Sequence, residues 1–183
     1  MIARWVSILF HPFVMVGVMA SVAAASRQSA GRAVRNVAVV VLFTLVPIAV
    51  LMVRQVRHGK WENPDASNRA ERPILYFTAG AALLAYLLIV SPDSGMRRGV
   101  GVTLGMMAAC AVATRWVKVS LHMAFSTLTA ITLALMRSPV GYALLLALPV
   151  IMWSRLTLRR HTGIEVALGT IIGAAASAAI YYL

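Results

Sequence analysis

The chain has 183 residues, of which 61% are hydrophobic and 12% are charged, and its mean hydropathy is +0.84. Soluble domains average about 45–50% apolar and about 25% charged residues, so this composition excludes an ordinary soluble domain and indicates a polytopic membrane protein. The formal net charge is +12. In a membrane protein this basic excess favours contacts with anionic lipid head groups or with an anionic substrate, and we expect no nucleic-acid partner.

Seven apolar segments follow one another along the chain, and each is predicted to be a helix. They cover residues 5–25, 36–53, 74–90, 99–117, 123–136, 139–153 and 162–183. Because about 17–25 apolar residues cross the hydrocarbon core of a bilayer, the sequence predicts an all-α fold. We expect a polytopic membrane helix bundle of about six to seven transmembrane helices, forming a single domain over residues 1–183. The fifth and sixth segments are short, which predicts tilt, shielding by neighbouring helices or extension by a flanking turn.

Single residues within these segments refine the prediction. The first segment has a basic start and a small-residue end, as signal peptides do, but the His11-Pro12 pair and the many later segments favour a retained first helix. The one cysteine, Cys110, excludes an intramolecular disulfide. Tryptophans at segment ends are predicted to anchor the chain at the membrane interface, and these are Trp5, Trp61, Trp116 and Trp153.

Three polar segments are expected on one face of the membrane. They cover residues 54–73, 118–122 and 154–161, and an even number of apolar segments separates each from the next. Side chains from all three segments can therefore lie at one site. We expect Arg72, His122, Arg155 and His161 to surround one phosphate-sized position.

The residue types in these segments suit phosphate chemistry. Arginine presents a rigid fork of donors that matches phosphate oxygens. Histidine titrates near neutrality and serves as a nucleophile or as a general acid. Glu165 lies four residues after His161, and positions i and i+4 share a helix face, so Glu165 is placed to orient the imidazole. Attraction to lipid head groups remains the alternative for Arg159 and Arg160.

These motifs resemble the type 2 phosphatidic acid phosphatases, a family of integral-membrane lipid phosphatases. The family carries Lys, six residues, Arg-Pro, then Pro-Ser-Gly-His, then Ser-Arg, five residues, His, three residues, Asp. The third motif matches in spacing from Ser154-Arg155 through His161 to Glu165, with Glu in place of Asp. The second is present as Ser120-Leu121-His122, without the Pro and the Gly. The resemblance covers about residues 60–170 and is that of a divergent bacterial branch.

The resemblance implies a role for each matching residue. His161 would attack phosphorus and form a phosphohistidine, oriented by Glu165. His122 would protonate the leaving alcohol and then activate water. The phosphate oxygens would be held by Arg72, Arg155 and Ser120, with Arg69 as an additional ligand. The implied substrate is a lipid phosphate or polyprenyl (di)phosphate, and the reaction would need no metal and no cofactor.

The first motif departs from the family. Arg72-Pro73 is retained, but Asp65 stands where the family has Lys. This exchange removes a positive charge from the site, and Arg69 or Lys60 would have to replace it. We expect Asp65 to avoid the phosphate and to pair with Arg69 or Arg72, or to face solvent.

Two other functions remain open at this stage. One is a catalytically weakened binder or transporter of anionic lipid. The other is a metal-dependent enzyme similar to the prenyltransferases, whose Asp-rich motif and following Arg-Pro resemble NPDASNRAERP at 63–73. The lack of a second acidic cluster disfavours it. The resemblance implies a multi-pass protein of the cell inner (plasma) membrane with an extracytoplasmic site, whereas the distribution of Lys and Arg favours the cytoplasmic face. We expect the extracytoplasmic site.

Overall fold

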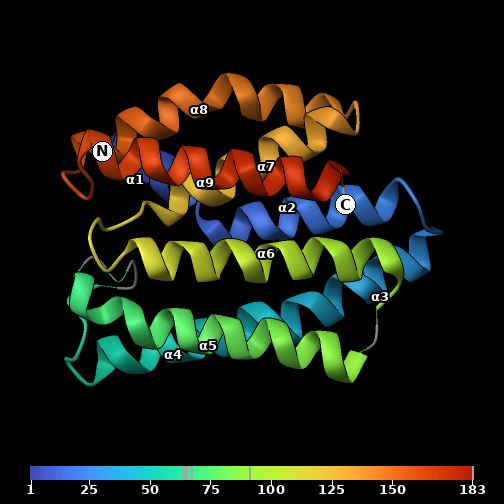
Figure 1. Ribbon diagram of the computed structural model, residues 1–183, viewed down its shortest axis with the longest axis horizontal. Coiled ribbons are helices and arrows are strands. Elements are labelled where there is room, and N and C mark those ends of the chain that lie inside the picture. The colour runs from blue at the N-terminus through green and yellow to red at the C-terminus, as the bar shows by residue number, and fades with distance from the viewer. Residues whose placement is uncertain (64–65, 67, 91, 183) are drawn as a thin grey trace. The chain divides into compact units, whose positions relative to one another are not determined.

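The computed structural model describes residues 1–63, 66, 68–90 and 92–182, and all regular elements within them are helical (Figure 1). The helices are α1 (Ile2–Leu9), α2 (Pro12–Ala25), α3 (Ala30–Val40), α4 (Val46–Arg57), α5 (Arg72–Ala85), α6 (Ser94–Ala113), α7 (Leu121–Leu135), α8 (Pro139–Thr157) and α9 (Gly163–Tyr182). A π-helical turn, Val41–Leu45, joins α3 to α4, and a second, Tyr86–Val90, extends α5. The all-α prediction is confirmed for the described residues.

Several helices have the length and composition of membrane spans. Among the described residues these are Ala30–Arg57, Arg69–Val90, Pro139–Thr157 and Gly163–Tyr182, and the α1–α2 pair makes a fifth if it counts as one broken span. Four to five such helices indicate a multi-pass membrane protein, fewer than the six to seven predicted. The fifth predicted segment is the short helix α7, and the sixth is extended at its C-terminal end to Thr157.

The helices form two compact units. The terminal unit comprises Met1–Val37 and Val117–Leu183, and the middle unit comprises Ala38–Trp116. The single domain expected from the sequence stays a prediction.

Helix α7 is the centre of the terminal unit, where α2, α8 and α9 pack against it (Figure 1). It is buried on nearly all sides from Leu121 to Leu133. Shielding by neighbours is therefore the explanation that applies to this short segment.

Small residues set the distance between α7 and α9. A Cβ atom on Gly169 would lie 2.5 Å from the carbonyl oxygen of Ser120, and one on Gly173 would lie 2.3 Å from that of Ala124. One turn further on, Ser177 Oγ donates to the carbonyl oxygen of Leu128 at 3.1 Å. Small residues spaced four apart thus let the two backbones touch, as in many membrane helix pairs. This contact also aligns the first turns of the two helices.

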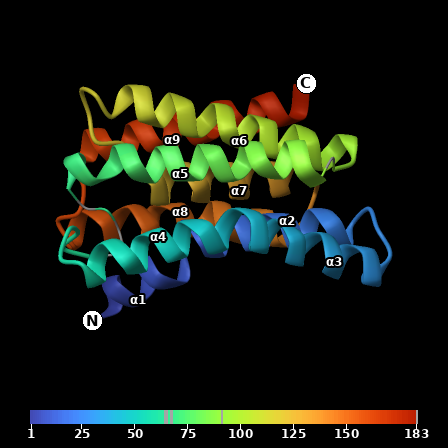
Figure 2. The same ribbon diagram turned by 90° about the horizontal axis from the view of Figure 1, so that it is seen from below.

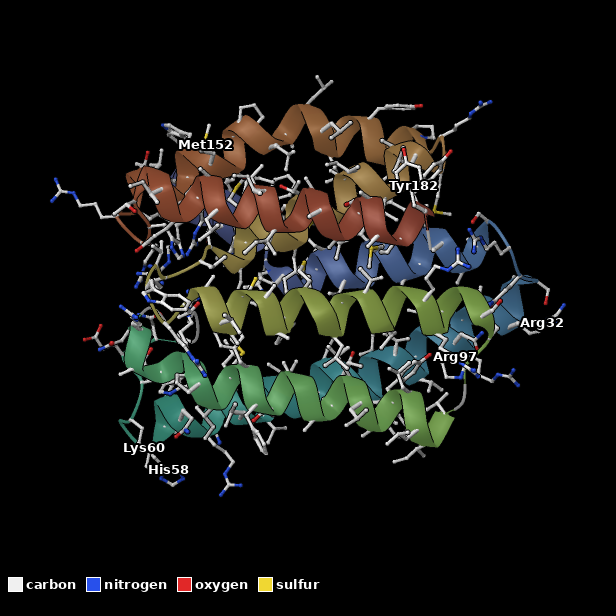
Figure 3. The ribbon with its side chains drawn as sticks, viewed as in Figure 1. Arg32, His58, Lys60, Arg97, Met152 and Tyr182 are labelled. Atoms are coloured by element: carbon white, nitrogen blue, oxygen red, sulfur yellow. The ribbon has the colours of Figure 1, made fainter. Side chains whose placement is uncertain are left out.

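In the middle unit α5 lies between α4 and α6 (Figure 2). Figure 3 shows His58 and Lys60 pointing outward at the end of this unit where α4 finishes, with Arg97 at its opposite end. Trp61 is only 5% exposed, so the prediction that it anchors the chain at the interface is wrong. The exposed side chains of Trp5, Trp116 and Trp153 are compatible with that role.

Candidate active site

Residues from four helices gather at one end of the terminal unit. We call Ser7, His122, Arg155, His161 and Glu165 the histidine–arginine cluster. The first turns of α7 and α9 are joined by a hydrogen bond from Ser120 N to Glu165 O at 3.1 Å. Arg155 and His161 both interact electrostatically with His122. The cluster thus brings together three of the four residues expected around one phosphate-sized position.

The turn between α8 and α9 delivers His161 to the cluster. Arg160 N donates to Arg155 O and Arg159 N donates to Leu156 O, which is the hydrogen-bond pattern of a Schellman ending. Arg159 adopts a φ of 51°, a left-handed conformation that a residue with a Cβ enters at a cost of about 1–2 kcal/mol. Strain of this kind is commonly stored where a chain must place a functional side chain.

Glu165 then fixes the orientation of His161. Glu165 Oε2 lies 2.8 Å from His161 Nδ1 and accepts a second hydrogen bond from Thr162 N at 3.2 Å. Glu165 N in turn donates to Thr162 Oγ1 at 3.4 Å, so the carboxylate also closes a capping box at the start of α9. A carboxylate only accepts, so Nδ1 carries a proton, and in the neutral imidazole the lone pair is then on Nε2. The hydrogen bond expected from the four-residue spacing is present.

Arg155 and His122 share a partner that the sequence did not indicate. Arg155 NH1 donates to Ser7 Oγ at 2.5 Å, and His122 Nε2 lies 3.4 Å from the same oxygen. His122 Nε2 also contacts the Ser7 carbonyl oxygen at 3.2 Å. Arg155 is 2% exposed and His122 is 5% exposed, so both contacts are protected from bulk water.

The neighbouring polar residues of this end have structural partners. Ser120 caps α7, and its hydroxyl accepts from Met123 N at 3.5 Å. Ser154 Oγ donates to Ala3 O at 2.6 Å and so ties α8 to α1. Lys118 Nζ donates to Arg160 O at 2.9 Å and lies 3.9 Å from Glu165 Oε2. Lys118 therefore places a positive charge beside the carboxylate that holds His161.

The remaining predicted ligands belong to the middle unit. Arg72 is buried, and it donates to Ala66 O at 3.1 Å and to Tyr76 Oη at 3.3 Å. Arg69 is exposed and donates to Trp116 O at 3.4 Å. The prediction for Asp65 lies outside the described residues. Phosphate binding by Arg69 and Arg72 stays a prediction.

The sequence did not indicate Ser7, because an apolar segment such as 5–25 predicts one continuous helix. The chain breaks at His11-Pro12, where α1 and α2 meet at 44°. His11 Nδ1 accepts from Phe13 N at 3.3 Å and caps α2, and the His11 ring packs edge-on against His122 with centroids 5.3 Å apart. A histidine followed by proline inside an apolar segment was the available signal for this break.

No protein-family model, curated protein or solved structure matched the chain in three comparisons with known proteins. Within the described ranges, no group of three or more His, Cys, Asp and Glu side chains is placed to hold a metal ion.

Proposed function

We propose that this chain is an integral-membrane lipid phosphatase that resembles the type 2 phosphatidic acid phosphatases and acts through a phosphohistidine intermediate. The observation that carries the proposal is the carboxylate-held imidazole of His161 in one cluster with His122 and a buried arginine. A histidine oriented by a carboxylate and accompanied by a phosphate-binding guanidinium is suited to nucleophilic attack on phosphorus.

The reaction has two balanced steps. In the first, the Nε2 lone pair of His161 forms a bond to phosphorus while the bond from phosphorus to the lipid oxygen breaks. His122, doubly protonated at this stage, gives a proton to that oxygen and becomes neutral, and Arg155 stabilises the charge on the other phosphate oxygens. In the second step His122 takes a proton from water, the water oxygen attacks phosphorus, and the phosphorus–nitrogen bond breaks to release inorganic phosphate.

The proposed substrate class rests on the membrane-length helices of the chain. The cluster lies at helix ends of a chain with several membrane-length helices, and the ends of a spanning helix are where lipid head groups lie. The proposal therefore covers a lipid phosphate or a polyprenyl (di)phosphate, with about six to seven transmembrane helices in the inner (plasma) membrane and the cluster on the extracytoplasmic face.

Phosphate release by the purified protein in detergent micelles tests the proposal. A panel of lipid phosphates and polyprenyl diphosphates is assayed with and without a metal chelator, beside the His161→Ala variant. We expect release that is insensitive to the chelator and abolished in the variant. Lipid binding without release would favour the binder or transporter, and chelator-sensitive release would favour the metal-dependent enzyme. Turnover by His161→Ala near that of the unaltered protein would contradict the mechanism.

A further inference from the structure

The Ser7 hydroxyl lies between two functional side chains of the cluster. It contacts both the guanidinium of Arg155 and the imidazole of His122, which are the two groups assigned to the phosphate and to the leaving oxygen. Ser7 is 8% exposed, so this oxygen lies inside the cluster and not on its outer surface.

The donors and acceptors around Ser7 leave its hydroxyl hydrogen available for another hydrogen bond. A guanidinium only donates, so Ser7 Oγ accepts the hydrogen bond from Arg155. A backbone carbonyl only accepts, so the contact from His122 Nε2 to Ser7 O requires a proton on Nε2. With a proton on Nε2, His122 is also the donor in its contact with Ser7 Oγ. The hydroxyl hydrogen of Ser7 is therefore used neither by Arg155 nor by His122.

Helix α1 is held so that Ser7 keeps this position. Ser154 Oγ binds Ala3 O, one turn before Ser7, and the His11 cap fixes the break one turn after it. The outward side of α1 carries the exposed apolar side chains of Ile2, Trp5, Ile8 and Leu9. The helix thus turns its buried serine toward the cluster and its apolar side chains away from it.

We propose that Ser7 is a phosphate-binding residue of this site, which donates its hydroxyl hydrogen to a phosphate oxygen held by Arg155. The inference rests on the proposed function and adds to it a ligand from outside all three motifs. Because Ser7 Oγ already touches the guanidinium, an oxygen bound to Arg155 lies within reach of the same hydroxyl. Hydrogen bonds to charged groups are the stronger ones, so this contact contributes measurably to affinity.

The test uses inorganic phosphate as the probe and needs no turnover. Its Kd is measured by phosphorus NMR titration of the purified protein in detergent micelles, for the unaltered chain and for Ser7→Ala. We expect Ser7→Ala to raise the Kd about tenfold. Ser7→Cys keeps nearly the same volume with a weaker donor, and a rise of about threefold is expected for it.

Ser177→Ala is the matched control. It also removes a buried hydroxyl from the terminal unit, but one that donates to Leu128 O and Gly173 O in the α7–α9 contact. Its phosphate Kd should equal that of the unaltered protein.

An unchanged Kd in folded Ser7→Ala and Ser7→Cys would overturn the inference, as would a lack of phosphate binding by the unaltered chain. Tighter binding in Ser7→Ala would also overturn it, because Ser7 would then compete with phosphate. If the unaltered protein binds phosphate but releases none from lipids, the proposed function fails while the Ser7 comparison still decides this inference.

Discussion

Replacing Gly169 by alanine tests how the α7–α9 contact supports the histidine–arginine cluster. The new Cβ would stand 2.5 Å from Ser120 O and 3.3 Å from Met123 Cβ. Ordinary van der Waals contact begins at 3.4 Å, so the two backbones must separate by about 0.9 Å at this point. The displaced segment of α7 is the one that carries His122, and Glu165 lies one turn before Gly169 on α9.

The size of the effect follows from two opposing terms. Alanine in place of glycine favours a helix by about 1 kcal/mol, whereas overpacking a well-packed contact costs about 1–3 kcal/mol. The net expectation is a destabilisation of up to about 2 kcal/mol. A misplacement near 1 Å between catalytic groups can cost about 100-fold in rate, so we expect turnover to fall more than stability does.

Thermal unfolding in micelles and phosphate release are the two assays. Gly17→Ala is the matched control, because it makes the same change in α2 of the same unit with no heavy atom within 4 Å of the new Cβ. Gly17→Ala should keep its activity and gain up to about 1 kcal/mol in stability. If Gly169→Ala behaved like Gly17→Ala in both assays, the account of this contact would be refuted.

Substitutions at three further positions test single features of the structure. Glu165→Gln should lower kcat by up to about 10⁴-fold with lipid binding retained, because a neutral amide supports the imidazolium poorly. Glu165→Asp should keep part of the activity. Equal kcat in the unaltered protein and both variants would contradict the orienting role. Tyr76→Phe removes the hydroxyl that accepts from Arg72 and should lower the free energy of unfolding in denaturant by about 1–2 kcal/mol. An unchanged free energy of unfolding would show that this hydrogen bond does not stabilise the fold. Arg159→Gly relieves a left-handed φ and should raise the thermal transition by the equivalent of about 1 kcal/mol, and a lower transition would contradict the strain argument.

The sequence predicted those features that depend on spacing along one helix. All seven apolar segments contain helices, and the bond between His161 and Glu165 follows from their four-residue separation. The capping box from Thr162 to Glu165 lies within the same helical turn. Local geometry fixes these contacts before any tertiary packing is considered.

Features that depend on which helices become neighbours were not predictable in this way. Helix α7 is buried on nearly all sides, so its sequence has no periodic polar face. An apolar sequence of this kind fits lipid and protein surroundings equally well. Ser7 reaches Arg155 across 148 residues of sequence, and only the break before Pro12 gives α1 its direction. Trp61 is buried although its position at a segment end is typical of an interfacial anchor.

The arrangement of the terminal unit also explains why one end of it suits chemistry. Glu165 is held from two directions, by the capping box within α9 and by the bond from Ser120 N to its own carbonyl oxygen. The second bond exists because Gly169 and Gly173 let α9 approach the backbone of α7. A carboxylate anchored in this way loses little freedom when it binds the imidazole, so the His161 ring is oriented before a substrate arrives. Gly169 and Gly173 therefore act as positioning residues for the site proposed for this chain.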